Sequence, residues 1–231
     1  MDHIRLSPRL QMVADFVPPC ACAADIGTDH GYLPVWLLQS GVIQSAIAAD
    51  IHAGPLANAR QSAAAYDLEE RFRFVQADGL QFSGAQAADV ITIAGMGGET
   101  ICTILAAAPW LREGRRLILQ PRSKVPELAD WLWHNGFTIE DAALCRDAGK
   151  RYLALRVLGR VAAQSCTVEQ LLLRHRDPLL PEQLKEEIRR QKRARAGMAH
   201  AKQTPEAALA ALDARLSELE ACLKEVQTWQ S

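Results

Sequence analysis

The 231-residue chain lacks the features that mark several large classes of protein. It has no run of about 18 apolar residues, so no segment could span a bilayer as a helix. It carries no large charge of either sign, because 26 basic and 27 acidic side chains give a formal net charge of −1. A charged-then-apolar signal peptide is missing from its first residues. We therefore expect a cytoplasmic protein with no membrane partner.

Metal-binding and redox patterns are also scarce. The six cysteines are scattered, and they lack the paired spacing of a zinc site. Cys20 and Cys22 could form a redox or metal pair, but their apolar neighbours favour small buried side chains. We predict no metal site and a reducing compartment.

Between residues 5 and 158, segments with a helix-like pattern alternate regularly with segments with a strand-like pattern. The first helix is expected at 5–17, where Ser7 and Pro8 provide an N-cap and a first-turn proline. Strands are then expected at Ala21–Gly27, Ser45–Ile51, Phe72–Ala77, Asp89–Ala94 and Arg116–Gln120. Between them we expect helices at Leu33–Ser40, Pro55–Tyr66, Glu99–Ala107 and Val125–Asn135.

Two further strands, Phe137–Leu144 and Arg151–Leu158, are joined by a hairpin-like turn. The whole pattern predicts an α/β fold with a doubly wound, mostly parallel sheet, helices on both faces and a terminal antiparallel hairpin. Such a hairpin is a frequent feature of class I methyltransferases.

After residue 158 the strand pattern stops. We expect helices at Val168–Leu173 and Pro181–Lys202, and a last helix that Thr204 and Pro205 begin and that ends near Gln227. The last helix carries an a/d seam at Leu209, Leu212, Leu216, Leu219, Leu223 and Val226. An antiparallel hairpin with the preceding helix, through Leu184, Ile188 and Met198, is favoured over a partner subunit. The prediction is therefore two domains, 1–159 and 160–231, in a monomer, with a homodimer through the C-terminal helix as the alternative.

Acidic and glycine residues stand at the carboxyl ends of successive predicted strands, where doubly wound sheets bind ligands. Asp25 and Asp29 flank Gly27 after the first strand, Asp50 ends the second, and Asp78 with Gly79 follows the third. Asp50 could accept both hydroxyls of a ribose, and Asp78 could accept an adenine amino group.

The first turn lacks the Gly-x-Gly-x-x-Gly fingerprint, and its two carboxylates would repel a pyrophosphate. S-adenosylmethionine, a sulfonium with an amino-acid tail, fits such a turn better. Neither a Pro-Cys loop nor an Asn/Asp-Pro-Pro-Tyr signature is apparent, which is consistent with attack on the methyl group by a ring nitrogen.

Several strings together resemble the bacterial TrmK family. They are 25–34 (DIGTDHGYLP), 54–55 (GP), 78–80 (DGL), 93–98 (IAGMGG), 119–121 (LQP) and the opening 6–10 (LSPRL). The resemblance covers about residues 5–158, and the last region is similar to that family's helical tail. It implies an S-adenosylmethionine-dependent tRNA (adenine-N1)-methyltransferase that acts on the adenine at position 22. Two positions depart from the family: Arg122, where the family has Asn, and Asp50, where it has Glu.

On this reading the cofactor is held by Asp25, Gly27, Thr28, Asp50, Ile51, Asp78, Gly79, Ala94, Gly95 and Met96, and the resemblance adds Arg9. The catalytic candidates are Asp29, His30 and Tyr32, which would contact the base. The alternatives are that Asp29 caps the helix at 30–40, that His30 is structural and that Tyr32 packs in the core.

The RNA partner is expected to meet Arg122, Lys124, Lys150 and Arg151 near the pocket, and Arg189, Arg190, Lys192, Arg193 and Arg195 in the tail. The tail residues lie in 185–202, which holds seven basic and two acidic residues. The alternative for that stretch is a solvated helix face balanced by Glu186 and Glu187. Two other functions stay open: methylation of another RNA or a small molecule, and non-catalytic cofactor binding.

Overall fold

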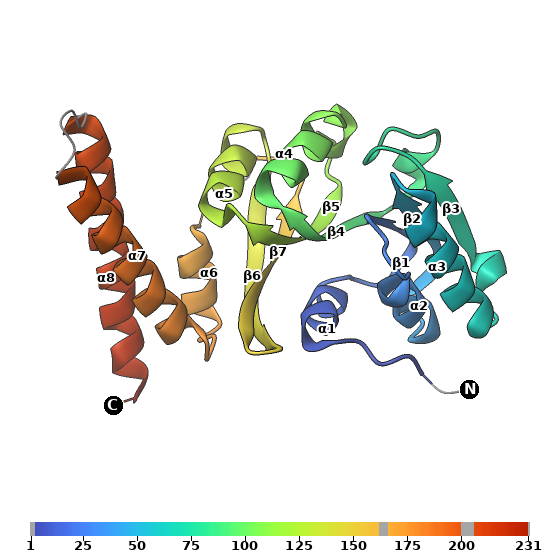
Figure 1. Ribbon diagram of the computed structural model, residues 1–231, viewed down its shortest axis with the longest axis horizontal. Coiled ribbons are helices and arrows are strands. Elements are labelled where there is room, and N and C mark those ends of the chain that lie inside the picture. The colour runs from blue at the N-terminus through green and yellow to red at the C-terminus, as the bar shows by residue number, and fades with distance from the viewer. Residues whose placement is uncertain (1–2, 162–165, 200–205, 231) are drawn as a thin grey trace. The chain divides into compact units, whose positions relative to one another are not determined.

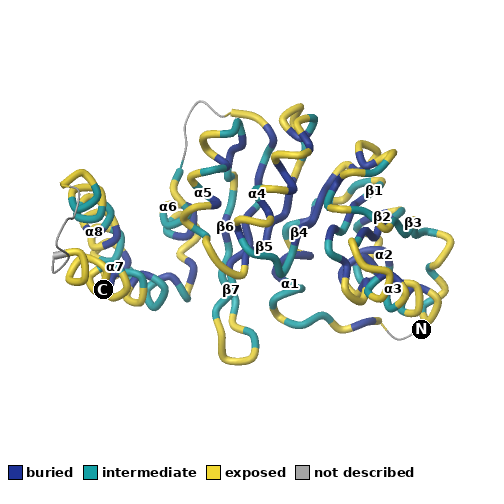
Figure 2. The backbone as a smooth tube through the Cα atoms, turned by 45° about the horizontal axis from the view of Figure 1, so that its top comes forward, coloured by how far each residue is buried: buried dark blue, intermediate teal, exposed yellow. Residues whose placement is uncertain are grey.

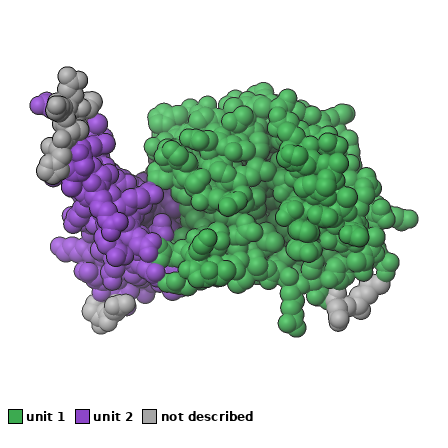
Figure 3. Space-filling model, viewed as in Figure 1, with its two compact units in different colours: residues 1–166 green, residues 167–231 purple. Residues whose placement is uncertain are grey.

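The computed structural model describes residues 3–161, 166–199 and 206–230. The chain forms two compact units, Met1–Cys166 and Thr167–Ser231 (Figure 3). The predicted boundary between 159 and 160 lies close to this division. Each unit is described below by itself.

Within the described residues, the first unit contains one seven-stranded sheet with the order β3-β2-β1-β4-β5-β7-β6 (Figure 1). Its strands are β1 (Cys20–Ile26), β2 (Ile43–Asp50), β3 (Phe72–Gln76), β4 (Val90–Gly97), β5 (Arg116–Ser123), β6 (Thr138–Asp147) and β7 (Lys150–Leu158). Strands β1 to β5 pair in parallel, whereas β7 is antiparallel to both β5 and β6. The predicted doubly wound sheet with a terminal antiparallel hairpin is confirmed.

Helices cover both faces of this sheet. They are α1 (Pro8–Asp15), α2 (Tyr32–Gln39), α3 (Ala53–Ala65), α4 (Gly98–Ala106) and α5 (Val125–His134). Ile118 of β5 belongs to the buried cluster that α1 and α2 form on the sheet. Its neighbours Leu117 and Leu119 point to the opposite face and are equally buried, as a strand covered on both sides requires. Figure 2 shows this buried centre and the exposed tip of the β6–β7 hairpin.

Local sequence explains how α1 begins. The Ser7 hydroxyl accepts a hydrogen bond from the Leu10 N–H, and Pro8 occupies the first turn, so the predicted cap is confirmed. The helix is shorter than the predicted 5–17 and spans only Pro8–Asp15.

The ends of β4 and β5 differ more from the prediction. The strand predicted at Asp89–Ala94 ends too early, because β4 continues through the glycine-rich segment to Gly97, which pairs with Ser123 of β5. The predicted end was wrong because glycine raises the probability of a loop locally, whereas pairing with β5 keeps this segment in the sheet. The pairing is irregular between Ala94 and Met96.

The second unit consists of α6 (Val168–Arg174), α7 (Leu180–Ala199) and α8 (Glu206–Gln227). Helices α7 and α8 pack together around buried residues that include Leu184, Ile188, Leu216 and Leu219. Ion pairs join Lys192 to Glu220 and Arg195 to Asp213, so residue numbers decrease along α8 as they increase along α7. The hairpin is therefore antiparallel, as expected, with Leu184 and Ile188 buried, but Met198, which was predicted in the interface, is exposed. The predicted turn at 202–205 lies outside the described residues.

No helix in the described part of the chain combines the length and hydropathy needed to cross a membrane.

Candidate active site

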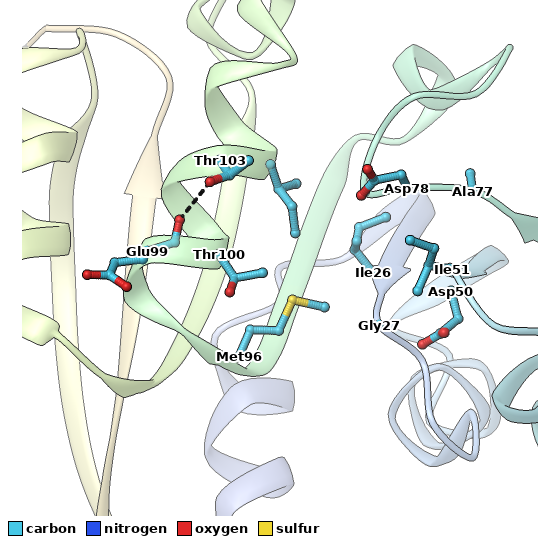
Figure 4. Close-up of a pocket in the computed structure, with 12 residues that line it drawn as sticks. Ile26, Gly27, Asp50, Ile51, Ala77, Asp78, Met96, Glu99, Thr100 and Thr103 are labelled. Atoms are coloured by element: carbon cyan, nitrogen blue, oxygen red, sulfur yellow. Dashed lines mark hydrogen bonds between the residues drawn. The ribbon is translucent and has the colours of Figure 1, made fainter.

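A cavity of about 470 Å³ lies at the carboxyl ends of β1, β2 and β4 (Figure 4). This is where the strand order switches, because the chain moves outward from β1 to β3 on one side and from β4 to β5 on the other. The lining residues are Ile26, Gly27, Asp50, Ile51, Ala77, Asp78, Gly79, Met96, Glu99, Thr100, Thr103 and Ile104. The position is the one expected for a ligand of a doubly wound sheet.

The structure brings six of the predicted cofactor residues to this lining: Gly27, Asp50, Ile51, Asp78, Gly79 and Met96. The other five, Arg9, Asp25, Thr28, Ala94 and Gly95, do not line it. The first two turns of α4 contribute Glu99, Thr100, Thr103 and Ile104, which were not predicted. A signal for them exists, because spacings of one, three and one place all four on one face of a helix that starts where β4 ends.

Two glycines keep the cavity open. Gly27 has φ +77°, and a Cβ at this position would lie 2.1 Å from the Met96 Cε. Figure 4 shows Met96 reaching from β4 toward Gly27. Gly79 has φ +57°, and its Cβ would lie 3.0 Å from Ile104. Both positions have a left-handed backbone that strains other residues. Ile104 also crowds the Gly79 position, whereas the atom near Gly27 is the end of the flexible Met96 side chain, which a larger residue would push aside.

Asp50 presents a carboxylate at the cavity wall. Its Oδ1 accepts a hydrogen bond from the His52 N–H at 2.8 Å and lies 3.4 Å from the His52 Nδ1. Within the described residues its Oδ2 accepts no hydrogen bond. Asp50 therefore retains acceptor capacity toward the cavity, as binding of ribose hydroxyls requires.

Asp25 lies behind this wall. The Thr92 hydroxyl donates to its Oδ1 at 2.7 Å. Burial raises the pKa of Asp25, and the nearby Asp50 charge adds to this, while the hydroxyls of Thr92 and Thr28 act in the opposite direction. The Asp25 carboxyl therefore joins the end of β1 to β4 through the Thr92 hydroxyl.

Thr28 carries a buried side-chain hydroxyl in the same turn. It is only 1% exposed, and its Oγ1 has no partner in hydrogen-bonding geometry among the described residues. Its N–H and that of Gly27 both donate to the Ala49 carbonyl, so these amides serve the turn itself. Thr28 does not line the cavity, and its hydroxyl acts on the Asp25 carboxyl, so both side chains lie behind the cavity wall.

The three predicted catalytic residues lie on the outside of the same turn. The rings of His30 and Tyr32 stack with centroids 5.1 Å apart, and the His30 Nε2 lies 3.6 Å from the Asp29 Oδ2. The side chains of Asp29 and His30 are 76% and 45% exposed, and Tyr32 is 42% exposed. Tyr32 is therefore not a core residue.

The helix-capping alternative for Asp29 is also excluded. The N-cap of α2 is Gly31 at φ 65°, and no side chain caps that helix.

The predicted RNA-binding residues divide into paired and unpaired cations. Lys124 lies 3.7 Å from Glu99 and 3.6 Å from Glu127, whereas exposed Arg122 contacts no acidic group in the described chain. Lys150 is exposed at the hairpin tip, and Arg151 is partly buried.

On α7, Arg190, Lys192 and Arg195 each form an ion pair, with Glu187, Glu220 and Asp213 respectively. The hydrogen bond from Arg195 lowers the pKa of Asp213. Arg189 and Arg193 are exposed and pair with no carboxylate of a described residue.

Cysteine and metal chemistry find no support in the described chain. Burial raises the pKa of the Cys20 thiol to about 11, so it stays protonated at neutral pH. No group of three or more His, Cys, Asp or Glu residues among those described could hold a metal ion.

Comparison with known proteins extends these observations. Residues 6–155 match the family described as "Methyltransferase domain". The tRNA (adenine(22)-N(1))-methyltransferase of Bacillus subtilis is 38% identical over 156 residues, which are 67% of this chain and 66% of that protein. The aligned segment thus spans just under two thirds of the length of that relative.

Solved structures match over nearly the whole chain. The B. subtilis m1A22 tRNA methyltransferase TrmK has a TM-score of 0.82 at 28% identity, covering 96% of this chain and 100% of that one. A putative tRNA (m1A22) methyltransferase of Streptococcus pneumoniae, solved with S-adenosyl-L-methionine, has a TM-score of 0.77 at 31% identity, covering 95% and 100%.

The sheet order, the terminal hairpin and the cavity at the switch point define a class I methyltransferase. Within that class, the chain belongs to the bacterial TrmK family.

Proposed function

We propose that this protein transfers the methyl group of S-adenosylmethionine to N1 of the adenine at position 22 of tRNA. The product is 1-methyladenosine. One observation carries the proposal: a cavity at the strand switch point presents Asp50 and Asp78 at successive strand ends, in a chain of the TrmK family.

The residues of the cavity fit this cofactor. The Asp50 Oδ2 is available to ribose hydroxyls, and Asp78 stands beside Gly79, where the absence of a Cβ lets a flat ring approach the backbone. Exposed Ile51 offers an apolar surface to the same ring. The cationic Arg9 is suited to the carboxylate of the amino-acid tail.

When bound, S-adenosylmethionine supplies an activated methyl group on a sulfonium. The chain then has to align the adenine N1 with that methyl group and exclude water, which are the main sources of rate in such a displacement. Tyr32 and His30 offer a stacked aromatic surface on which the adenine can lie. Asp29 lies beside them and takes a proton from the N6 amino group as the methyl group bonds to N1, so that positive charge does not build up on the base during the transfer.

Cations outside the cavity guide the tRNA backbone. Arg122, Lys150 and Arg151 serve the first unit, and the basic face of α7 serves the second, since phosphate contacts position a nucleic acid without reading its sequence. Because α7 covers the α8 seam within one chain, we propose a monomer. We propose the cytoplasm as its location, where tRNA would be available.

The test uses a transcribed tRNA with adenine at position 22 and a matched transcript with guanine there. Incubation with labelled S-adenosylmethionine, followed by nucleoside mass spectrometry, should give 1-methyladenosine from the first transcript only. Equal labelling of both transcripts would move the target to another position. Labelling of small molecules instead of tRNA would favour the metabolite alternative, and cofactor binding without any methylated product would favour the non-catalytic one.

A further inference from the structure

The end of β4 contains a bulge whose extra residue is Gly95. Ala94 pairs with Gln120 of β5 and Met96 pairs with Pro121, so Gly95 has no opposite residue. A bulge leaves the extra residue outside the hydrogen-bonded ladder, and its N–H then needs another acceptor. Here the Gly95 N–H donates to the Gln120 side-chain Oε1 at 3.1 Å.

The same oxygen accepts a second hydrogen bond. Arg9 of α1 donates from Nη1 to the Gln120 Oε1, also at 3.1 Å. The amide Nε2 of Gln120 donates to the Pro121 carbonyl at 3.0 Å. Gln120 is 0% exposed, so both ends of its amide are buried and hydrogen-bonded. A buried amide is costly unless it is paired in this way, and an apolar residue here would leave two donors without an acceptor.

The two donors lie side by side at the end of β4, since a Cβ on Gly95 would be 3.2 Å from the Arg9 Nη1. Gly95, at φ +78°, precedes Met96, whose side chain lines the cavity and lies against Gly27. The bulge therefore sets the direction in which Met96 points, as bulges beside active sites do. Arg9 is also held by the Asp147 carboxylate, which accepts from its N–H at 3.4 Å, and by the Tyr152 ring 5.5 Å away.

We propose that Gln120 is a positioning residue for methyl transfer. Its single carbonyl oxygen fixes both the bulge that directs Met96 and the guanidinium of Arg9. The residue touches neither cofactor nor base, and it acts through these two neighbours. This inference rests on the proposed function, because it takes the cavity to be the S-adenosylmethionine site.

The neutrality of the amide matters as well. A carboxylate at this position would keep an acceptor for Gly95 and Arg9, but it would pair with the Arg9 charge. Its second oxygen would also face the Pro121 carbonyl, to which the Gln120 Nε2 now donates. The amide holds the guanidinium while leaving its positive charge uncompensated for an anionic group of the ligand.

The experiment compares Gln120→Met with Ile118→Met. Both positions lie on β5, two residues apart and therefore on the same face of the strand, and both are 0% exposed. Each variant is assayed for its melting temperature, its dissociation constant for S-adenosylhomocysteine, and kcat and KM for both substrates.

The expected result is a selective loss. Gln120→Met should weaken S-adenosylhomocysteine binding and raise KM for S-adenosylmethionine by about 10-fold or more, the effect of one or two charged hydrogen bonds, while KM for tRNA changes less than about 2-fold. Ile118→Met should lower the melting temperature by a similar amount and leave the dissociation constant unchanged. A Gln120→Met protein that binds S-adenosylhomocysteine as the wild type does would overturn the inference.

A second variant covers the case in which Gln120→Met does not fold. Gln120→Glu preserves volume and the acceptor for Gly95, so it should fold and still bind S-adenosylhomocysteine more weakly, by roughly 3- to 10-fold, because Arg9 is neutralised. Unchanged binding by this variant would overturn the role of Gln120. Failure of the wild type itself to bind S-adenosylhomocysteine would instead overturn the proposed function.

Discussion

The two sides of the turn after β1 differ sharply in how they are built. On the inner side, the N–H groups of Gly27 and Thr28 donate hydrogen bonds to β2, and the Met96 side chain packs against Gly27. On the outer side, Asp29, His30 and Tyr32 are exposed and contact mainly one another. The difference suggests a cofactor half that exists before binding and an acceptor half that the incoming tRNA completes.

The largest effect should come from filling the space beside Gly27, on the inner side of the turn, which we call the inner half. Gly27→Val adds a branched side chain where even a Cβ would lie 2.1 Å from Met96, at φ +77°. We expect S-adenosylhomocysteine affinity to fall by about 100-fold or more, because the branched side chain and the Met96 that it displaces take up cavity space. Backbone strain of roughly 1–2 kcal/mol should lower the stability of the fold in addition. Isothermal titration calorimetry measures the affinity.

Gly41→Ala is the matched control for strain alone, because Gly41 has φ +68° and open space around its Cβ position. It should lose stability and keep cofactor affinity. Equal loss of affinity in both variants would mean that the inner half responds to general destabilisation.

Substitutions on the outer side of the turn, the outer half, should affect the kinetics with tRNA and not the binding of the cofactor. Tyr32→Ala removes a stacking surface, and base–aromatic stacking contributes about 1–3 kcal/mol per base. We expect kcat/KM for tRNA to fall by about 10- to 100-fold while S-adenosylhomocysteine binding is retained. Trp133→Ala on α5, where the tryptophan is 45% exposed, is the control for losing an exposed aromatic residue. A Tyr32→Ala protein with unchanged tRNA kinetics would remove Tyr32 from the site.

Whether a feature of the fold or of the site can be predicted from the sequence depends on the kind of interaction that forms it. Gly27, Asp50 and Asp78 are predictable because the carboxyl ends of parallel strands meet at one edge of a sheet. The four α4 residues have a signal in their helical spacing, whereas the Gly95 bulge has none, since it depends on the register between β4 and β5. A glycine-rich string looks like a loop until its pairing strand is known. For the same reason, the sequence alone does not reveal that Lys192 and Arg195 face carboxylates of α8.

Asp29→Asn tests whether the outer half takes part in chemistry. The amide keeps the shape of the side chain and loses most of its basicity, so we expect kcat to fall by about 10-fold, a modest effect for general base catalysis. Single-turnover kinetics should show the loss in the methyl-transfer step, with cofactor affinity unchanged. If the single-turnover rate equals that of the wild type, Asp29 is not the proton acceptor.

Thr28→Val probes the buried hydroxyl of the inner half. The Thr28 Oγ1 has no partner in hydrogen-bonding geometry among the described residues but acts on the Asp25 carboxyl, so its removal should change the free energy of unfolding by less than about 1 kcal/mol. Because Thr28 does not line the cavity, the dissociation constant for S-adenosylhomocysteine should change by less than about 2-fold. Thr92→Val, which removes the hydroxyl that donates to Asp25, should lower stability more. A Thr28→Val protein that binds S-adenosylhomocysteine about 10-fold more weakly would assign the hydroxyl to the ligand instead.

The smallest effect on turnover is expected on α7, which belongs to the second unit. Exposed Arg189 and Arg193 face no carboxylate of a described residue, whereas Lys192 and Arg195 are paired with α8. The double change Arg189→Ala and Arg193→Ala should weaken tRNA binding and leave kcat unchanged. It should also reduce the slope of log affinity against log salt by about 1.4–1.8, the value for two phosphate contacts. The matched pair Lys192→Ala and Arg195→Ala should mainly lower the melting temperature, because those cations already have partners. If both pairs change the salt slope equally, the ion pairs with α8 open when tRNA binds, and the whole basic stretch contacts phosphate as the sequence predicts.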